Sequence, residues 1–131
     1  MMAELQADHI AANVPNEAEF SAFLERDLRA YFAAAGIRSP SVRFEMLRQG
    51  PTQSGIAYPK YYLWVWVWSE GSPAVSGAVR VAAVQRERFE VTEFLARERI
   101  IAQPGQIGSI FPAPLVQPIR TRAAAGAFQA H

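Results

Sequence analysis

The segment from Tyr58 to Trp68 limits the folds open to this chain more than any other stretch of the sequence. Its aromatic and β-branched residues are typical of a β-strand. The even positions place four rings on one face, namely Tyr62, Trp64, Trp66 and Trp68. The odd positions place on the other face Tyr61, Leu63, Val65 and Val67. Because both faces are apolar, the pattern predicts a central strand that is covered on both sides.

A second strand is predicted from about Ala74 to Gln85, because the five residues 69–73 are typical of a hairpin loop. This loop length predicts that large rings face small side chains: Trp68 with Ala74, Trp66 with Ser76 and Trp64 with Ala78. Tyr62 then faces Arg80, whose guanidinium is placed to lie over an aromatic ring. The pairs on the other face are Val67 with Val75, Val65 with Gly77, Leu63 with Val79 and Tyr61 with Val81.

An amphipathic helix is predicted over residues 17–35. Its apolar residues recur at steps of three and four: Phe20, Phe23, Leu24, Leu28, Tyr31, Phe32 and Ala35. Asn16 and Glu19 have the spacing of a capping box at the start of this helix. Gly36 is predicted to end it in a left-handed conformation.

Two further strands and a helical C-terminal region complete the predicted elements. An alternation typical of a half-buried strand places Val42, Phe44 and Met46 opposite Arg43, Glu45 and Leu47. Residues 86–102 also have helical spacing, but a strand over about 88–94 and a short helix over 95–102 describe them better. Downstream, a single long helix is excluded by Pro112, Pro114 and Pro118. Short helical turns lying across the sheet are expected there.

The chain of 131 residues has the length of one domain. We expect a flexible N-terminal arm over residues 1–15, a single domain over 16–119 and a flexible tail over 120–131. The predicted class is α+β, with a long N-terminal helix packed on a three- to four-stranded antiparallel sheet and short C-terminal helices. This order of elements resembles that of the cystatin-like and NTF2-like cone folds, which often hold a ligand between helix and sheet.

Composition excludes several classes of protein. Without cysteine there is no disulfide framework, thiolate zinc site or cysteine nucleophile. The apolar fraction of 50% and the net charge of +1 are not those of a disordered chain. No apolar run approaches the roughly 20 residues of a membrane helix, and the first residues lack the pattern of a secretion signal. A soluble, cytoplasmic protein is expected.

The residues that could carry catalysis are few. The two histidines, His9 and His131, lie in the predicted arms. No stretch collects three or four metal ligands, and no hydrolase motif occurs. Glu45 is expected to pair with an arginine rather than to act as a buried acid. We therefore predict no catalytic residue, no metal site and no cofactor, and nothing in the sequence supports an enzyme.

The aromatic face requires a partner. Its four rings expose roughly 600–1,000 Å² in total, whereas the largest apolar patch of a soluble monomer is about 300–600 Å². The predicted helix over 17–35 can cover only one face of the sheet. Three interpretations remain for the other face. The C-terminal segment folds back over it through Phe111, Leu115 and Val116, another chain covers it, or a small apolar ligand binds there.

These observations predict a non-catalytic binding or self-assembly module, with a second copy or another protein as its partner. The candidate binding residues are Tyr62, Trp64, Trp66, Trp68 and Arg80. The alternative is a small-molecule pocket, with or without catalysis, between helix and sheet. Single-stranded nucleic acid could stack on three of the rings, with Arg80, Arg86 and Lys60 on its phosphates, but the near-zero net charge argues against nucleic acid.

Overall fold

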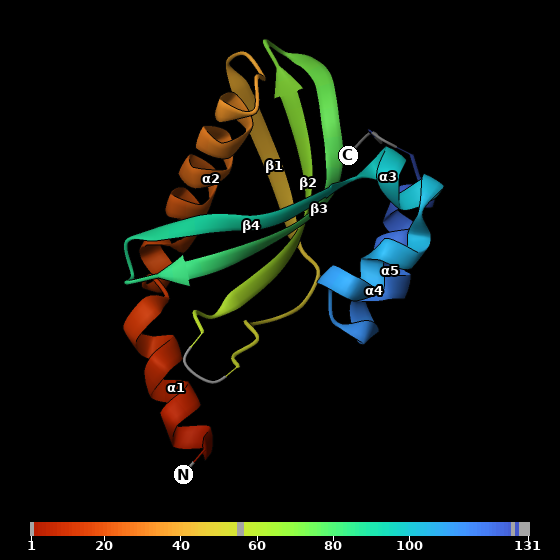
Figure 1. Cartoon of the computed structure of the whole chain (residues 1–131). Helices are drawn as coiled ribbons and strands as arrows, with labels where there is room; N and C mark the ends of the chain where they lie inside the picture. The colour runs from red at the N-terminus through yellow and green to blue at the C-terminus, as the bar shows by residue number, and fades with distance from the viewer. Residues whose placement is uncertain (1, 55–56, 127, 129–131) are drawn as a thin grey trace.

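A four-stranded antiparallel sheet lies between two helical layers (Figure 1). The computed structural model describes residues 2–54, 57–126 and 128. The helices are α1 (Met2–Asn13), α2 (Glu17–Ala34), α3 (Arg97–Ala102), the 3-10 turn η1 (Pro104–Gln106), α4 (Ile107–Ile110) and α5 (Ala113–Ala124). The strands are β1 (Pro40–Met46), β2 (Lys60–Ser69), β3 (Ser72–Val84) and β4 (Arg88–Ala96), in that order across the sheet. The predicted α+β class is confirmed.

Helix α2 begins and ends where its capping residues predict. The Asn16 side chain accepts a hydrogen bond from the Glu19 N–H (3.1 Å) and donates one to the Glu19 carboxylate (2.7 Å), which completes the capping box. Gly36 has a φ of 103°, and the Ile37 N–H donates to the Phe32 carbonyl at 3.0 Å. This pattern is the Schellman motif that a glycine after the helix favours.

One face of the sheet packs against α2. The helix contributes three buried side chains, Leu24, Leu28 and Phe32. The buried side chains of the sheet on this face are Tyr61, Leu63, Val65, Val67, Val79, Val81, Ala83 and Phe89. These are the odd positions of β2 and their partners on the neighbouring strands, so the predicted division of the two faces is confirmed.

The register of β2 and β3 agrees with the prediction at every pair from Tyr61–Val81 to Val67–Val75. The prediction is wrong at the end of the hairpin. Trp68 pairs with Pro73 rather than Ala74, because the register shifts between Val67 and Trp68. The loop is a two-residue turn at Glu70 and Gly71, whose φ values of 51° and 83° are typical of the primed turns that close hairpins.

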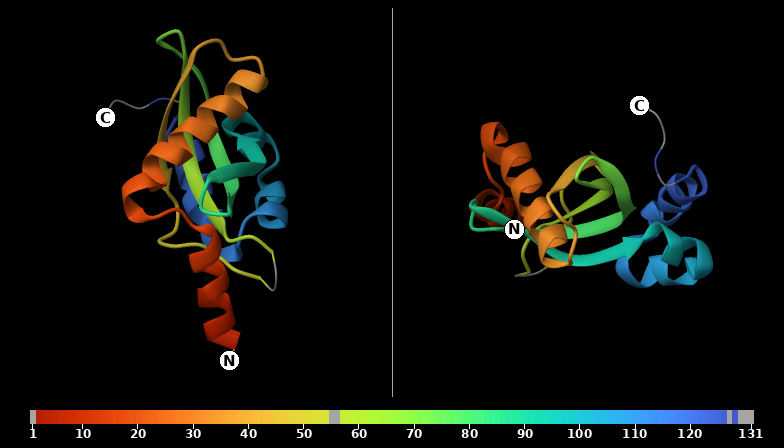
Figure 2. Two further views of the ribbon diagram at one scale, coloured as in Figure 1. Left: turned by 90° about the vertical axis from the view of Figure 1, so that its left-hand side faces the viewer. Right: turned by 90° about the horizontal axis from the view of Figure 1, so that it is seen from above.

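The N-terminal segment is helical, whereas the sequence predicted a loose arm. Asn13, at the end of α1, is buried and fastens it to the β3–β4 hairpin. Its side-chain carbonyl accepts from the Gln85 N–H at 3.0 Å, and its backbone carbonyl accepts from the Arg86 N–H at 2.7 Å. The rest of α1 extends beyond the sheet (Figure 2).

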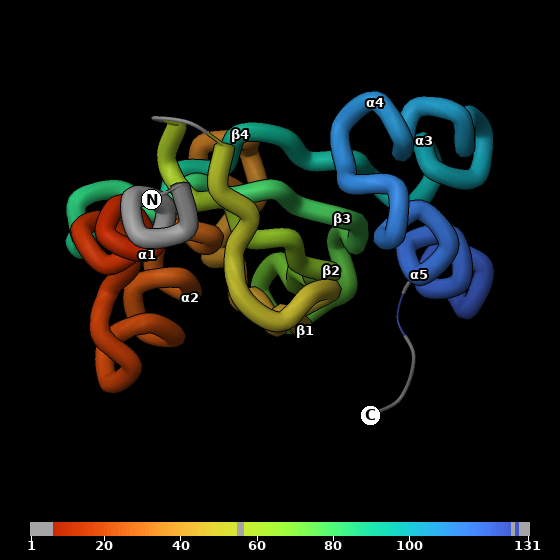
Figure 3. The backbone as a smooth tube through the Cα atoms, turned by 90° about the horizontal axis from the view of Figure 1, so that it is seen from below, coloured from red at the N-terminus to blue at the C-terminus, as the bar shows by residue number. Residues whose placement is uncertain are grey.

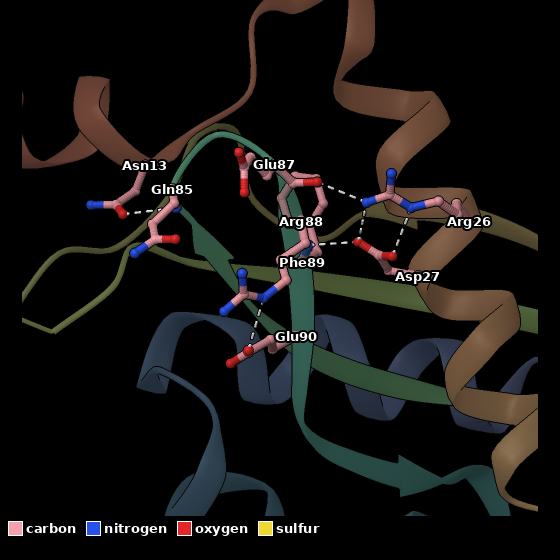
Figure 4. A network of polar contacts seen from close by, with 8 residues as sticks. All are labelled: Asn13, Arg26, Asp27, Gln85, Glu87, Arg88, Phe89 and Glu90. Atoms are coloured by element: carbon pink, nitrogen blue, oxygen red, sulfur yellow. Dashed lines mark hydrogen bonds and ion pairs between the residues drawn. The ribbon is translucent and has the colours of Figure 1, made fainter.

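Helix α2 is fastened to the same hairpin through a second set of polar contacts (Figure 4). The Asp27 carboxylate accepts from the Phe89 N–H at 2.7 Å and from the Arg26 guanidinium at 2.9 Å. Arg26 also donates to the Glu87 carbonyl at 2.8 Å. Both N-terminal helices therefore hold the hairpin, although neither α1 nor these contacts show in the hydrophobic pattern of the sequence.

The C-terminal segment forms short helices, as predicted, but α5 is longer than expected. It continues through Pro118 to Ala124, and Ala123 is buried, so the domain extends past residue 119 into the predicted tail. Pro114 lies in the first turn, where its missing N–H costs no helical bond. Pro118 is exposed and removes only one bond. Residues 127 and 129–131, including His131, lie outside the described part. Within that part, no helix combines the length and apolar character needed to span a membrane.

Candidate functional site

The aromatic face that the sequence singles out is buried in this structure. Trp64 is 1% exposed, Trp66 5% and Tyr62 6%. The residues that cover them come from α3, α4, α5 and the connection between the last two: Ile100, Ile107, Phe111, Leu115, Ile119 and Ala123. The interpretation in which the C-terminal segment folds back is therefore confirmed, and the face forms a second hydrophobic core.

The two ends of the aromatic row have specific partners. The Tyr62 hydroxyl lies 2.7 Å from the Thr52 hydroxyl, and its ring meets Phe111 edge-to-face with centroids 6.0 Å apart. Trp68, at the other end, is half-buried, and its ring lies 5.3 Å from that of Phe128. Trp68 is thus the one tryptophan of the row that keeps substantial contact with solvent.

The predicted contact between the Arg80 guanidinium and an aromatic ring is not formed among the described residues. The Arg80 guanidinium donates to the Thr92 hydroxyl at 2.7 Å and to the Ile110 carbonyl at 3.2 Å. It therefore joins β4 to the end of α4. The guanidinium that lies over a tryptophan ring belongs to Arg43 of β1, 5.8 Å from the centroid of Trp66.

The structure thus gathers Tyr62, Trp64 and Trp66 on one face, as predicted, but does not expose them. The expectation of an open binding face is corrected, because the sequence pattern could not show that six residues of the C-terminal segment reach these rings. The burial also removes the rings from contact with nucleic acid bases. Lys60, a proposed phosphate ligand, donates to the Tyr58 carbonyl at 2.7 Å, and burial together with the Arg80 charge lowers its pKa.

Two surface depressions lie beside the C-terminal helices, with volumes of about 150 and 240 Å³. The smaller is lined by α3 and α5 residues, and the larger by β4, Arg99, Gln106 and Ile110. Both are smaller than the roughly 300–1,000 Å³ of typical ligand pockets. Neither lies between α2 and the sheet, where the cone-like arrangement would hold a ligand.

Glu45 pairs with an arginine, as predicted. Arg122 of α5 donates to both carboxylate oxygens, one of them at 2.8 Å. The pair is partly open to solvent, with the Glu45 side chain 52% exposed and that of Arg122 30% exposed. Among the described residues, no three histidine, aspartate or glutamate side chains converge as metal ligands would. The Glu45–Arg122 ion pair joins β1 to α5.

A different surface, the outer edge of β1, has no strand partner among the described residues. β1 has one strand neighbour, β2, and forms the outer strand of the sheet (Figure 3). Its seven residues pair with β2 without any shift of register. An edge strand of this kind presents unpaired peptide groups, which are a template for another strand.

The register shows which peptide groups of β1 face outward. Leu47 continues the pairing with β2, and its N–H donates to the Tyr62 carbonyl at 2.9 Å. Antiparallel pairs alternate between hydrogen-bonded and non-hydrogen-bonded, so the odd residues of β1 direct their peptide groups toward β2. The even residues direct theirs outward: Val42, Phe44 and Met46. No cap or loop hydrogen bond between described residues uses these outward groups.

The side chains of β1 follow the same alternation. Val42, Phe44 and Met46 are half-buried and pack on the α2 side of the sheet. Arg43 and Glu45 are exposed on the opposite side, near Trp66 and Arg122. The alternation in the sequence predicts this strand but not its edge position, because the order of strands in a sheet is not a local property.

The other edge of the sheet, β4, is interrupted. Arg80 pairs with Glu93 and Val81 with Val91, so Thr92 is an extra residue that forms a bulge. Arg80 hydrogen-bonds this residue twice, through its guanidinium and its carbonyl. Bulges and charged side chains are the usual protection of an edge against pairing with another chain. β4 has both, since its exposed residues include Arg88, Glu90 and Glu93.

We found no match when the chain was compared with models of protein families, with curated proteins and with solved structures.

Proposed function

We propose that this chain is a non-catalytic self-assembly module in which the edge strand β1 joins a second copy. The observation that carries the proposal is the row of outward peptide groups at Val42, Phe44 and Met46. A strand added at this edge would pair all three residues, as in other cases of strand addition. We expect this assembly in the cytoplasm.

The half-buried side chains of β1 support the same role. Val42, Phe44 and Met46 belong to the hydrophobic core beneath α2 but remain partly open to solvent. A neighbouring strand would cover the rest of their apolar surface, which is the main source of free energy in association. β1 pairs regularly, whereas a bulge at Thr92 interrupts β4, and this contrast explains why assembly is assigned to β1 alone.

The test compares the same substitution on the two edges. Val42 of β1 and Val91 of β4 are both half-buried and pack on the α2 side of the sheet. Lysine in an edge strand opposes pairing with another chain. We expect Val42→Lys to remain at the monomer mass of 14.5 kDa, while the wild type and Val91→Lys approach twice that mass as the concentration rises.

Light scattering coupled to gel filtration measures the mass up to about 1 mM, the weak end of specific affinities. Circular dichroism and thermal unfolding check whether Val42→Lys and Val91→Lys keep the fold. A wild-type chain that stays monomeric at every concentration would contradict self-assembly. Equal dimerisation of Val42→Lys and wild type would exclude the β1 edge.

A further inference from the structure

We infer that two β1 strands pair antiparallel about Phe44, so that Arg43 of each copy faces Glu45 of the other. This inference rests on the proposed self-assembly and adds the register of the contact. It follows from the direction of the peptide groups and from the order of charges along β1.

The peptide groups restrict the registers that two copies can adopt. In a symmetric antiparallel pair, residues with outward groups must face one another. Every register centred on a residue from Val42 to Met46 meets this condition, because even positions then face even positions of the other copy, whereas a register centred between two residues does not. Two-fold symmetry makes every contact occur twice.

The charges select one of these five centres. With Arg43 or Glu45 at the centre, that residue faces the same residue of the other copy, so like charges oppose each other. With Phe44 at the centre, Val42 faces Met46 of the other copy, and Arg43 faces Glu45 of the other copy. With Val42 at the centre, Arg43 faces Ser41. With Met46 at the centre, Glu45 faces Leu47. Only the Phe44 register places opposite charges directly across the interface and keeps apolar residues together on the α2 side.

The geometry of this register favours the ion pairs. Arg43 and Glu45 face each other as a non-hydrogen-bonded pair, the type in which side chains lie closest, with Cα atoms about 4.5 Å apart. Glu45 already accepts from Arg122 of its own chain. Arg43 of the other copy would therefore add to an existing ion pair. The interface would then join β1, β1 of the second copy and both α5 helices.

Charge exchange tests the register. Arg43→Glu places two glutamates on each copy, and Glu45→Arg places two arginines. We expect each variant alone to dimerise about tenfold or more weakly than wild type, because symmetry turns two attractive pairs into two repulsive ones. An equimolar mixture of the two variants restores both pairs, and it should form a heterodimer with nearly wild-type affinity. Sedimentation equilibrium of each sample and of the mixture measures this.

Disulfide trapping provides a second measurement that does not depend on charge. The chain has no cysteine, so Arg43→Cys and Glu45→Cys each carry a single thiol. Their predicted separation suits a disulfide. We expect the oxidised mixture to form more covalent dimer than either variant alone, with circular dichroism as the check on folding.

The outcomes separate the register from the self-assembly. Restored association and preferential cross-linking in the mixtures support the Phe44 register. If the wild type dimerises but neither mixture behaves as expected, the register is wrong and the self-assembly stands. If the wild type is monomeric, both are wrong.

Discussion

The two faces of the sheet are covered in different ways. On one face a single helix of 18 residues, α2, supplies all three buried helical side chains, Leu24, Leu28 and Phe32. On the other face four short segments between residues 97 and 124 supply one to three buried side chains each. The α2 face of the sheet is mostly aliphatic, with buried rings at Tyr61 and Phe89, whereas the other face carries the row Tyr62, Trp64 and Trp66. The comparison indicates that the aromatic face is a core assembled from many small contacts.

This difference bears on where the molecule can bind. Because both faces are covered, a partner must use the outer surfaces of helices or the sheet edges. Among the edges, β1 is regular and β4 is bulged. The aromatic residues that attract attention in the sequence therefore stabilise the domain, while the plainer strand before them carries the proposed contact.

Among the variants that compare the two covers, Trp64→Ala is expected to lose the most free energy of unfolding. Replacing a fully buried aromatic residue by alanine costs about 3–5 kcal/mol, a large share of the roughly 5–15 kcal/mol that holds a domain folded. Trp68→Ala, in the same row but half-exposed, is the matched control and should cost clearly less. Urea unfolding followed by circular dichroism measures both. Equal losses would show that the C-terminal helices do not cover the row as described.

How far the sequence predicts this fold depends on whether the determinant is local. The capping residues Asn16 and Gly36 predict α2 within one or two residues. The alternation in β2 predicts both faces and most of the register, because two apolar faces admit few alternatives. The prediction fails at Trp68, since the loop length set its partner and the real turn is shorter.

Other features depend on contacts that are distant in sequence. Helix α1 has no clear apolar face, and the buried Asn13 that fastens it pairs with Gln85 and Arg86 far along the chain. The cover of Trp64 comes from residues that begin more than thirty positions later, at Ile100. The open edge of β1 depends on the order of four strands. None of these three features follows from a local sequence pattern. The candidate site is therefore the β1 edge and not the aromatic rings that the sequence predicted.

The second test compares a crowded position in the sheet, where β3 and β4 approach closely on the α2 side, with an open position in the C-terminal helices. A Cβ added to Gly77, on the α2 side of β3, would clash with the Leu95 carbonyl oxygen and would lie 2.9 Å from the Ala96 Cα. These are backbone atoms, so Gly77→Ala should cost about 1–3 kcal/mol, as overpacking does.

Gly108→Ala is the matched control in the other cover. Gly108 lies in α4, with no heavy atom within 4 Å of an added Cβ, and alanine favours a helix over glycine by roughly 1 kcal/mol. We expect an unchanged or slightly higher free energy of unfolding in urea titrations. If Gly77→Ala and Gly108→Ala lose similar free energies of unfolding, the two glycines are not packed as differently as described.

The smallest test uses two adjacent tyrosines that point to opposite faces. Tyr62→Phe removes the hydroxyl that lies 2.7 Å from Thr52, and loss of such a bond costs about 0.5–1.5 kcal/mol. Tyr61→Phe, on the α2 face, should cost less at neutral pH. Urea unfolding of both variants at pH 7 checks this order, and a larger loss for Tyr61→Phe would reverse the assignment.

Alkaline unfolding adds an independent readout for the same pair. Burial raises the pKa of Tyr61 above its ordinary value of 10.0. A group whose pKa is higher in the folded state holds its proton more tightly there, so its contribution to stability is complete below pH 10 and is lost as the pH rises through the folded pKa. Tyr61→Phe removes this loss, and its free energy of unfolding should therefore fall less than that of wild type between pH 9 and about pH 11. If the two fall in parallel, the Tyr61 hydroxyl is not buried by α2, and the tight packing assigned to that face does not extend to the end of the sheet.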